Sequence, residues 1–288
     1  MTARRNTSPA PWAEHGVKGN LTWDQAIDAW AAFMAASACT RGTIELRVYQ
    51  VSRAARDLGG TPALATTSQL VEWLAGQEWS PNTRRAYRGA LRAFFSWAVS
   101  AGVVVTSPAA ALPVVKVPRA VPRPTPEDAY RHAVRTCSDG RVRLALMLAG
   151  AYGLRRSEVA RARREDVHED LAGWSLLVHG KGGHERAVPL LDDTARAILR
   201  RPAGWLFPSP RRPGEHLTAA HLGKLVAAEL PEGFTMHSLR HRCGTVAYGA
   251  TRDLRAVQEL LGHAKPETTA IYTAVPGGAV RAAVEAAA

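Results

Sequence analysis

Residues 173–190 read GWSLLVHGKGGHERAVPL, and this stretch decides the fold class of the 288-residue chain. Two short runs of β-forming residues, GWSLLVHG and RAVPL, are separated by a glycine-rich turn at 180–183, which is the signature of a hairpin. The sequence on both sides follows helical patterns instead. We therefore predict a mainly α-helical protein in which residues 166–190 form one small antiparallel β-sheet.

Composition restricts the partners that the chain can bind. The formal net charge is +12, from 37 Lys and Arg against 25 Asp and Glu. Such a balance favours a polyanion, nucleic acid first, because each neutralised phosphate releases condensed counterions; a GC-rich genome would explain part of the arginine content equally well. Three widely spaced cysteines fit neither a metal site nor a disulfide framework. With no apolar run of about 18 residues, the composition predicts a cytoplasmic protein without bound metal.

A proline-rich stretch predicts a division into two domains. Six prolines fall between residues 108 and 126, and frequent proline prevents both helix and sheet pairing. Residues 108–124 are therefore predicted to form an extended linker. The linker contains the basic residues Lys116, Arg119 and Arg123. They either lie along a DNA backbone or are simply solvated. After the linker, Thr125 and Pro126 predict the N-cap and first position of the next helix.

The part before the linker shows helical patterns only. A first helix is predicted in LTWDQAIDAWAAFMAAS, with Thr22 as N-cap and Phe33 among the apolar residues at helical spacing. Further helices are predicted over 43–58, over 67–74 and after Ser80. The last combines an apolar stripe with a basic face, which is either a solvated surface or a DNA contact. The residues of that face are Arg84, Arg85, Arg88 and Arg92.

The C-terminal half contains six side chains suited to chemistry at one phosphate. They are Arg155 in GLRRSE, Lys181 in GKGGHER, His237 and Arg240 in HSLRH, His263 in LGH, and Tyr272 in TTAIYT. Arginine forks match phosphate oxygens, whereas lysine can also give up a proton. A phenol with an ordinary pKa of about 10 needs cations and a base before it can attack. Taken singly, each residue has a structural alternative. Arg155 could form a salt bridge with Glu158 or simply lie at the surface, and Tyr272 could be a core residue.

The order and context of these six residues resemble the tyrosine recombinases, the family of phage integrases and of the Xer and Cre enzymes. The resemblance covers roughly residues 20–275 and includes the stretch SPNTRRAYRGALRAFFSWAVSAGVVVTSPAAAL. It implies a helical, SAM-like core-binding domain over 19–107 and an α-helical catalytic domain over 125–275. Residues 1–18 would be a flexible tail, and residues 276–288 a tail helix that docks in trans or remains in cis. Relatives often carry Trp at the position of Arg164 and Leu at that of Ala162. They often carry Thr at the positions of Arg242 and Tyr152.

The resemblance also implies a role for each residue. Arg155 and Arg240 would bind the non-bridging oxygens of the scissile phosphate, and Tyr272 would attack it. His237 would assist the deprotonation of Tyr272, and His263 would hydrogen-bond the phosphate. Lys181 would protonate the departing 5′ oxygen, while Glu158 would support the site. Such chemistry conserves the energy of the phosphodiester bond in a 3′-phosphotyrosyl link, so neither ATP nor a metal cofactor is expected.

The predicted activity is site-specific DNA recombination through a Holliday junction at a double-stranded attachment or crossover site. The enzyme would be a monomer in solution, a homotetramer on DNA, and nucleoid-associated when bound; an accessory DNA-bending or directionality protein is left open. About 20 residues before the first helix are too few for an added arm-binding domain, so the chain resembles the simple enzymes of the family. An integrase is favoured because the Xer-like match in the N-terminal half is generic. The alternatives are an Xer-like chromosome or plasmid dimer resolvase, a type IB topoisomerase-like nicking-closing enzyme and a catalytically silent DNA-binding regulator.

Overall fold

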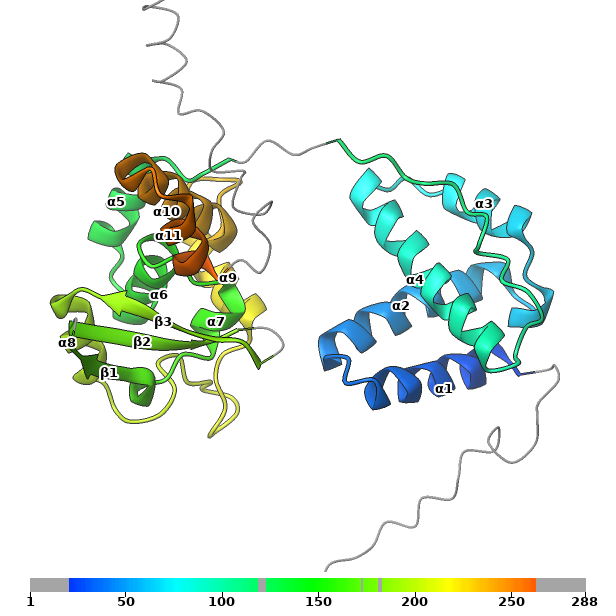
Figure 1. Cartoon of the computed structure of the whole chain (residues 1–288), viewed down its shortest axis with the longest axis horizontal. Coiled ribbons are helices and arrows are strands. Elements are labelled where there is room, and N and C mark those ends of the chain that lie inside the picture. The colour runs from blue at the N-terminus through cyan, green and yellow to red at the C-terminus, as the bar shows by residue number, and fades with distance from the viewer. Residues whose placement is uncertain (1–20, 119–122, 172, 181–182, 263–288) are drawn as a thin grey trace, which may run out of the picture. The chain divides into compact units, whose positions relative to one another are not determined.

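The computed structural model describes residues 21–118, 123–171, 173–180 and 183–262. The chain forms two compact units, and the division between them falls after residue 119, inside the predicted linker. Both units are built mainly from helices (Figure 1). The first unit contains α1 (Trp23–Ala36), α2 (Arg41–Leu58), α3 (Thr67–Ala75) and α4 (Pro81–Ser100), with a short 3-10 turn at Pro62–Leu64.

The helices of the first unit begin at side-chain caps and close around an aromatic core. Thr22 accepts a hydrogen bond from the Gln25 amide, which fixes the start of α1. Trp23 stacks on Phe94 of α4 with ring centroids 5.6 Å apart, and Trp30 meets Phe94 edge-on at 5.4 Å. Phe33 shares the apolar helical spacing but is 52% exposed, because the tryptophans of α1 occupy the side that faces α4.

The start of the predicted linker belongs to this first unit. Ala109 and Leu112 are buried in its core. The Thr67 hydroxyl donates to the Pro108 carbonyl at 2.9 Å, and the Arg88 guanidinium donates to the Leu112 carbonyl at 2.8 Å. Proline prevents regular secondary structure here but not packing, so residues 108–112 lie on the helices instead of extending away from them.

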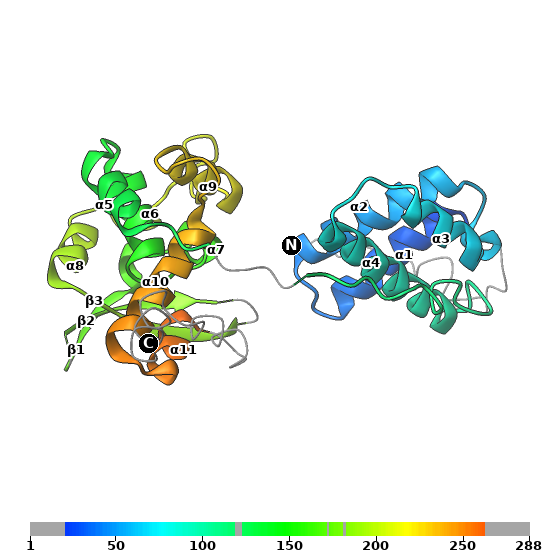
Figure 2. The ribbon, with the colours of Figure 1, turned by 90° about the horizontal axis from the view of Figure 1, so that it is seen from above.

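In the second unit, helices pack against a three-stranded sheet (Figures 1 and 2). The three strands are antiparallel and lie side by side in chain order, and His179 pairs with Glu185 at the predicted hairpin. One face of the sheet enters the core through Leu176, Val178 and Val188. The elements are α5 (Glu127–Thr136), α6 (Gly140–Gly150), α7 (Arg156–Ala160), a 3-10 turn (Arg164–Asp166), β1 (Val167–Asp170), β2 (Gly173–His179), β3 (Glu185–Leu190), α8 (Asp192–Leu199), α9 (Ala219–Ala228), α10 (Met236–Thr251) and α11 (Leu254–Leu261).

The start of α5 differs from the sequence prediction. The helix begins at Glu127 with Pro126 at the N-cap, so Thr125 does not cap it. Thr125 is buried, and its hydroxyl lies 2.8 Å from the Ser238 hydroxyl of α10. Its amide also donates to the Ser238 carbonyl at 3.1 Å. A tertiary partner has replaced the local capping bond, and the segment before α5 is thereby fixed to α10.

Gly150, at the end of α6, lies directly against the ring of Tyr130. A Cβ at this position would lie 2.4 Å from Tyr130 Cε2. The ring cannot retreat freely, because the Arg242 guanidinium stacks 3.9 Å from its centre and donates to Glu127 and to the Gly150 carbonyl. Gly150→Ala is therefore expected to lower the free energy of unfolding by about 1–3 kcal/mol, as overpacking does. Urea unfolding measures this effect.

The matched control is Gly249→Ala in α10. A Cβ at Gly249 meets nothing within 4 Å, so alanine there brings only its helix propensity. That change is expected to be neutral or to stabilise by up to about 1 kcal/mol. Equal unfolding midpoints for the two variants would contradict the packing argument for Gly150.

Candidate active site

A left-handed glycine turn places Arg155 at the surface of the second unit. Gly153 has φ 68°, and a Cβ there would lie 2.5 Å from Leu261 Cδ2, so both backbone and packing require glycine. Leu154 next to it is fully buried, whereas the Arg155 side chain is 38% exposed. The Gly153 carbonyl accepts a hydrogen bond from Arg240 of α10. The turn thus brings two predicted site arginines together.

Glu158 of α7 is the buried acid that organises these cations. Its carboxylate accepts from the Arg155 Nη1 at 2.7 Å, from Arg186 Nη2 of β3 at 2.9 Å and from the Arg155 amide at 2.8 Å. The Arg240 Nη1 lies 4.0 Å away. Burial alone would raise the pKa of Glu158, but the bonds from Arg186 and Arg155 outweigh it and lower the pKa to about 2. The carboxylate is therefore ionised at neutral pH.

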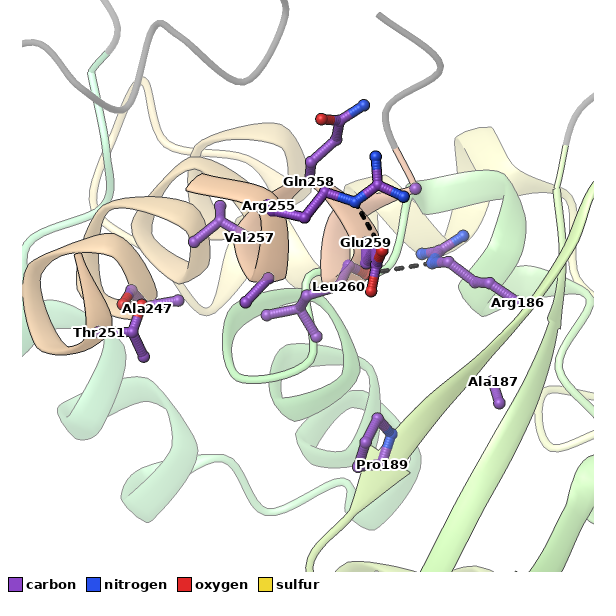
Figure 3. A pocket seen from close by; sticks show the side chains of 12 residues that line it. Arg186, Ala187, Pro189, Ala247, Thr251, Arg255, Val257, Gln258, Glu259 and Leu260 are labelled. Carbon is purple, nitrogen blue, oxygen red and sulfur yellow. Dashed lines mark hydrogen bonds and ion pairs between the residues drawn. The ribbon is translucent and has the colours of Figure 1, made fainter. Parts of the chain in front are cut away.

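The same three arginines hold the C-terminal end of α11. Arg186 Nε donates to the Leu260 carbonyl at 3.1 Å (Figure 3), Arg240 Nη2 to the Leu261 carbonyl at 2.6 Å, and Arg155 Nη2 to the Gly262 carbonyl at 2.8 Å. The last carbonyls of a helix lack intrahelical partners and form the negative end of its dipole. We call Arg155, Arg186 and Arg240 the arginine clasp. It holds successive carbonyls directly before His263.

A histidine pair lies on α10 beside the clasp. The Nε2 atoms of His237 and His241 are 3.0 Å apart, so one ring donates to the other. Burial and the Arg240 guanidinium lower the pKa of His237 below its ordinary 6.5. Burial, His237 and Arg240 lower the pKa of His241 to about 4. Both imidazoles are therefore uncharged at neutral pH, which leaves His237 able to accept a proton.

One groove of about 800 Å³ collects these predicted side chains. Arg155, His237 and Arg240 all line it, together with residues of α7 and α9. The other three predicted residues, Lys181, His263 and Tyr272, lie outside the described residues. Their described neighbours are at the site nonetheless: a Cβ on Gly180 would lie 3.9 Å from Glu158 Oε1, and Gly262 accepts from Arg155.

Comparison with known proteins identifies the family. The sequence profile of the phage integrase family matches residues 126–276. The chain belongs to this family of tyrosine recombinases. The tyrosine recombinase XerD of Caulobacter vibrioides is 33% identical over 79% of this chain and 81% of its own, and XerA of Pyrococcus horikoshii is 29% identical over 90% and 92%.

Solved structures show the same fold. A lambda integrase dimer bound to a COC′ core site superposes with a TM-score of 0.71 at 19% identity, covering 88% of this chain and 78% of that one. A lambda integrase tetramer bound to a Holliday junction superposes with a TM-score of 0.68 at 20% identity, covering 86% and 79%. Both agree with two domains and a mainly helical architecture that carries one small sheet.

Sequence reasoning missed two residues of this recombinase's site, Arg186 and His241. Arg186 pairs across the strands with Val178, which is buried, so its own side chain points inward from β3. An arginine at an inward position of a strand needs an acidic partner, and this signal pointed to a buried carboxylate near Arg186 without identifying Glu158. His241 stands in HSLRH one turn after His237, the spacing at which helical side chains touch.

Two of the residues that the family resemblance singled out have clear local contacts. Arg164 donates through Nε to the Leu199 carbonyl at 3.0 Å, which joins the turn before β1 to the end of α8. The Tyr152 hydroxyl donates to Thr194 Oγ1 of α8 at 2.8 Å. Both substituted side chains therefore hold α8 in place, and neither enters the groove.

The predicted DNA-binding arginines of α4 divide into two kinds. Arg84 donates to the Gln77 carbonyl at 2.7 Å and Arg88 to the Leu112 carbonyl, so both are half-buried ties within the first unit. Arg85 and Arg92 are exposed and stand seven residues apart, on one side of the helix. In the linker, Lys116 and Arg123 are exposed, while Arg119 lies outside the described residues.

Two absences concern the described part of the chain alone. There, no group of three or more His, Cys, Asp or Glu side chains is placed to hold a metal ion. Nor does that part contain a helix with the length and apolarity needed to cross a membrane.

Proposed function

We propose that this recombinase cuts and rejoins double-stranded DNA at a specific attachment or crossover site, through a 3′-phosphotyrosyl link to Tyr272. The observation that carries the proposal is the convergence of Arg155, Arg240 and an uncharged His237 on one open groove. Guanidinium forks match the non-bridging oxygens of a phosphodiester, and a neutral imidazole accepts a proton. Gly262, the last described residue, accepts a hydrogen bond from Arg155 and precedes Tyr272 by ten residues in the sequence.

The proposed reaction assigns one step to each residue. The bond from the Tyr272 oxygen to phosphorus forms as the bond from phosphorus to the 5′ oxygen breaks. His237 takes the phenol proton, and Lys181 protonates the departing oxygen. Arg155 and Arg240 neutralise the charge that develops on the pentacoordinate phosphorus, with a hydrogen bond from His263. Glu158 acts through the arginines, which it holds in place.

Strand exchange follows when the 5′ hydroxyl of a second duplex attacks the phosphotyrosyl link. We propose that a homotetramer on DNA performs this exchange through a Holliday junction, as in the lambda integrase tetramer described above. The role proposed first is that of a simple integrase. The identity with Xer relatives over most of the chain favours dimer resolution as the second candidate role.

The test uses the full chain and a nicked duplex that traps the covalent intermediate. Wild type and Tyr272→Phe are incubated with it in EDTA without ATP, and denaturing gels reveal protein attached to a 3′ end. We expect an adduct with wild type and none with Tyr272→Phe. Tight DNA binding without an adduct would contradict the proposal and favour a silent regulator.

A second pair of assays separates recombination from simple nicking and closing. Exchange between two labelled duplexes supports the recombinase. Relaxation of supercoiled plasmid without exchange would instead support the topoisomerase-like alternative. Integration between attachment sites, compared with resolution of a plasmid dimer, distinguishes the two proposed roles.

A further inference from the structure

We infer that Arg156 of α7 and Lys224 of α9 form a second phosphate-binding subsite in the active-site groove. It would bind a backbone phosphate of the same DNA that places its scissile phosphate between Arg155 and Arg240. Gly223 of α9 positions the Arg156 side chain for this purpose. The inference rests on the proposed function and extends it from one phosphate to two.

Arg156 and Lys224 open into the same groove as the reacting residues. Both are exposed, and both line the groove of about 800 Å³ with Arg155, His237 and Arg240. Among the described residues that line it there is no aspartate or glutamate. Two exposed cations facing an acid-free groove suit a polyanion, because their charges are not already neutralised by a protein carboxylate.

The surroundings of Arg156 differ from those of Arg155. Arg155 points to Glu158 and to the Gly262 carbonyl, whereas Arg156 lies across α9. The two adjacent guanidiniums therefore offer binding points at different places along the groove. In the described part of the chain, Arg156 and Lys224 form no ion pair with an acidic side chain.

The Arg156 side chain crosses α9 at Gly223, where no Cβ is in the way. A Cβ at Gly223 would lie 2.7 Å from Arg156 Cδ and 3.3 Å from its Nη1. Glycine is unfavourable in the middle of a helix, and Gly223 has no positive φ that would require it. Its position is explained by the side chain that crosses it, so a methyl group there should push Arg156 away from its place in the groove.

The start of α10 adds to the positive potential. Thr235, Met236 and His237 line the groove, so the N-terminal end of this 16-residue helix opens into it. The positive end of a helix dipole favours anions within its first turn. The groove therefore combines fixed side-chain charge on α7 and α9 with the dipole of α10.

The test measures how DNA binding depends on salt. Arg156→Gln and Lys224→Gln, each in the Tyr272→Phe background, are titrated with the nicked duplex of the adduct assay at several salt concentrations. Losing one phosphate contact should reduce the slope of log K against log[salt] by about 0.9. The control is Arg135→Gln, an exposed arginine of α5 outside the groove, which should leave the slope unchanged.

A double-mutant cycle tests the positioning role of Gly223. Gly223→Ala should reduce the slope as much as Arg156→Gln does, but should change nothing in the Arg156→Ala background, where no side chain is left to displace. Gly249→Ala, which meets open space, should not alter binding. An effect of Gly223→Ala that disappears in the Arg156→Ala background would not come from a general loss of folding. Unfolding midpoints of all variants check for such a loss.

The possible outcomes distinguish a failure of the phosphate subsite from a failure of the proposed function. Unchanged slopes for Arg156→Gln and Lys224→Gln, with a normal wild-type adduct, would overturn the subsite and leave the proposed function intact. An equal effect of Gly223→Ala with and without the Arg156 side chain would overturn the positioning role. Absence of any wild-type adduct would instead count against the proposed function.

Discussion

Replacing Glu158 with glutamine is expected to lower the free energy of unfolding of the second unit by about 3 kcal/mol at pH 7. The carboxylate is only 1% exposed and lies within 4.0 Å of all three arginines of the clasp. Its pKa falls from 4.5 to about 2 on folding, and each pKa unit corresponds to about 1.36 kcal/mol. Glutamine keeps the shape but leaves the largely buried guanidiniums of Arg186 and Arg240 without their counter-charge, which is strongly destabilising. Urea unfolding at pH 7 gives the value.

The pH dependence of the free energy of unfolding tests the role of Glu158 independently. Because folding lowers the pKa, the stabilising contribution is complete above about 4.5 and is lost as pH falls through about 2. Wild type should therefore lose stability over this window, and Glu158→Gln should lose about 3 kcal/mol less there. The control is Glu259→Gln, whose pair with Arg255 is exposed and worth well under about 1 kcal/mol. A flat wild-type profile between these pH values would contradict the role of Glu158.

Replacing Arg155 with glutamine is expected to slow covalent adduct formation by about 10²–10³-fold, the usual effect of losing one donor to transition-state charge. Glutamine is shorter than arginine and lacks the positive charge that the phosphate requires. Single-turnover cleavage of the nicked duplex measures the rate. DNA affinity should change far less, since one cation among many is lost.

The control for Arg155 is Arg161→Gln at the other end of α7. Arg161 is exposed, donates to the Ser157 carbonyl at 3.2 Å and does not line the groove. Its adduct rate should stay near that of wild type. A rate for Arg155→Gln within about threefold of the control would rule out a direct role at the phosphate. Unfolding measurements separate such a role from loss of the clasp.

Local chemistry explains why the family and much of the fold were predictable. Thr22 caps α1 as expected, and β2 pairs with β3 as the hairpin pattern indicates. Gly153 allows the turn that exposes Arg155 while Leu154 stays buried. Each of these depends on neighbours within a few residues, so the residue types alone carry the information.

Features that join distant segments were not predictable in the same way. Phe33 fits the apolar spacing of α1 but lies outside the core, because α4 covers another side of the helix. Thr125 meets Ser238, which is 113 positions away, and so leaves the cap of α5 to Pro126. Arg88 has the pattern of a DNA contact but also holds the Leu112 carbonyl.

The sequence by itself determined the family, the helices, the hairpin and the residue types of the chemistry, because these depend on local propensity and on motif order. Only the tertiary structure decided that Arg186 joins Glu158 across 28 positions and that Arg156 crosses Gly223. The three arginines of the clasp come from separate segments and meet one carboxylate and one helix end. Their partners are chosen by how α7, β3, α10 and α11 pack, and no local pattern carries that information.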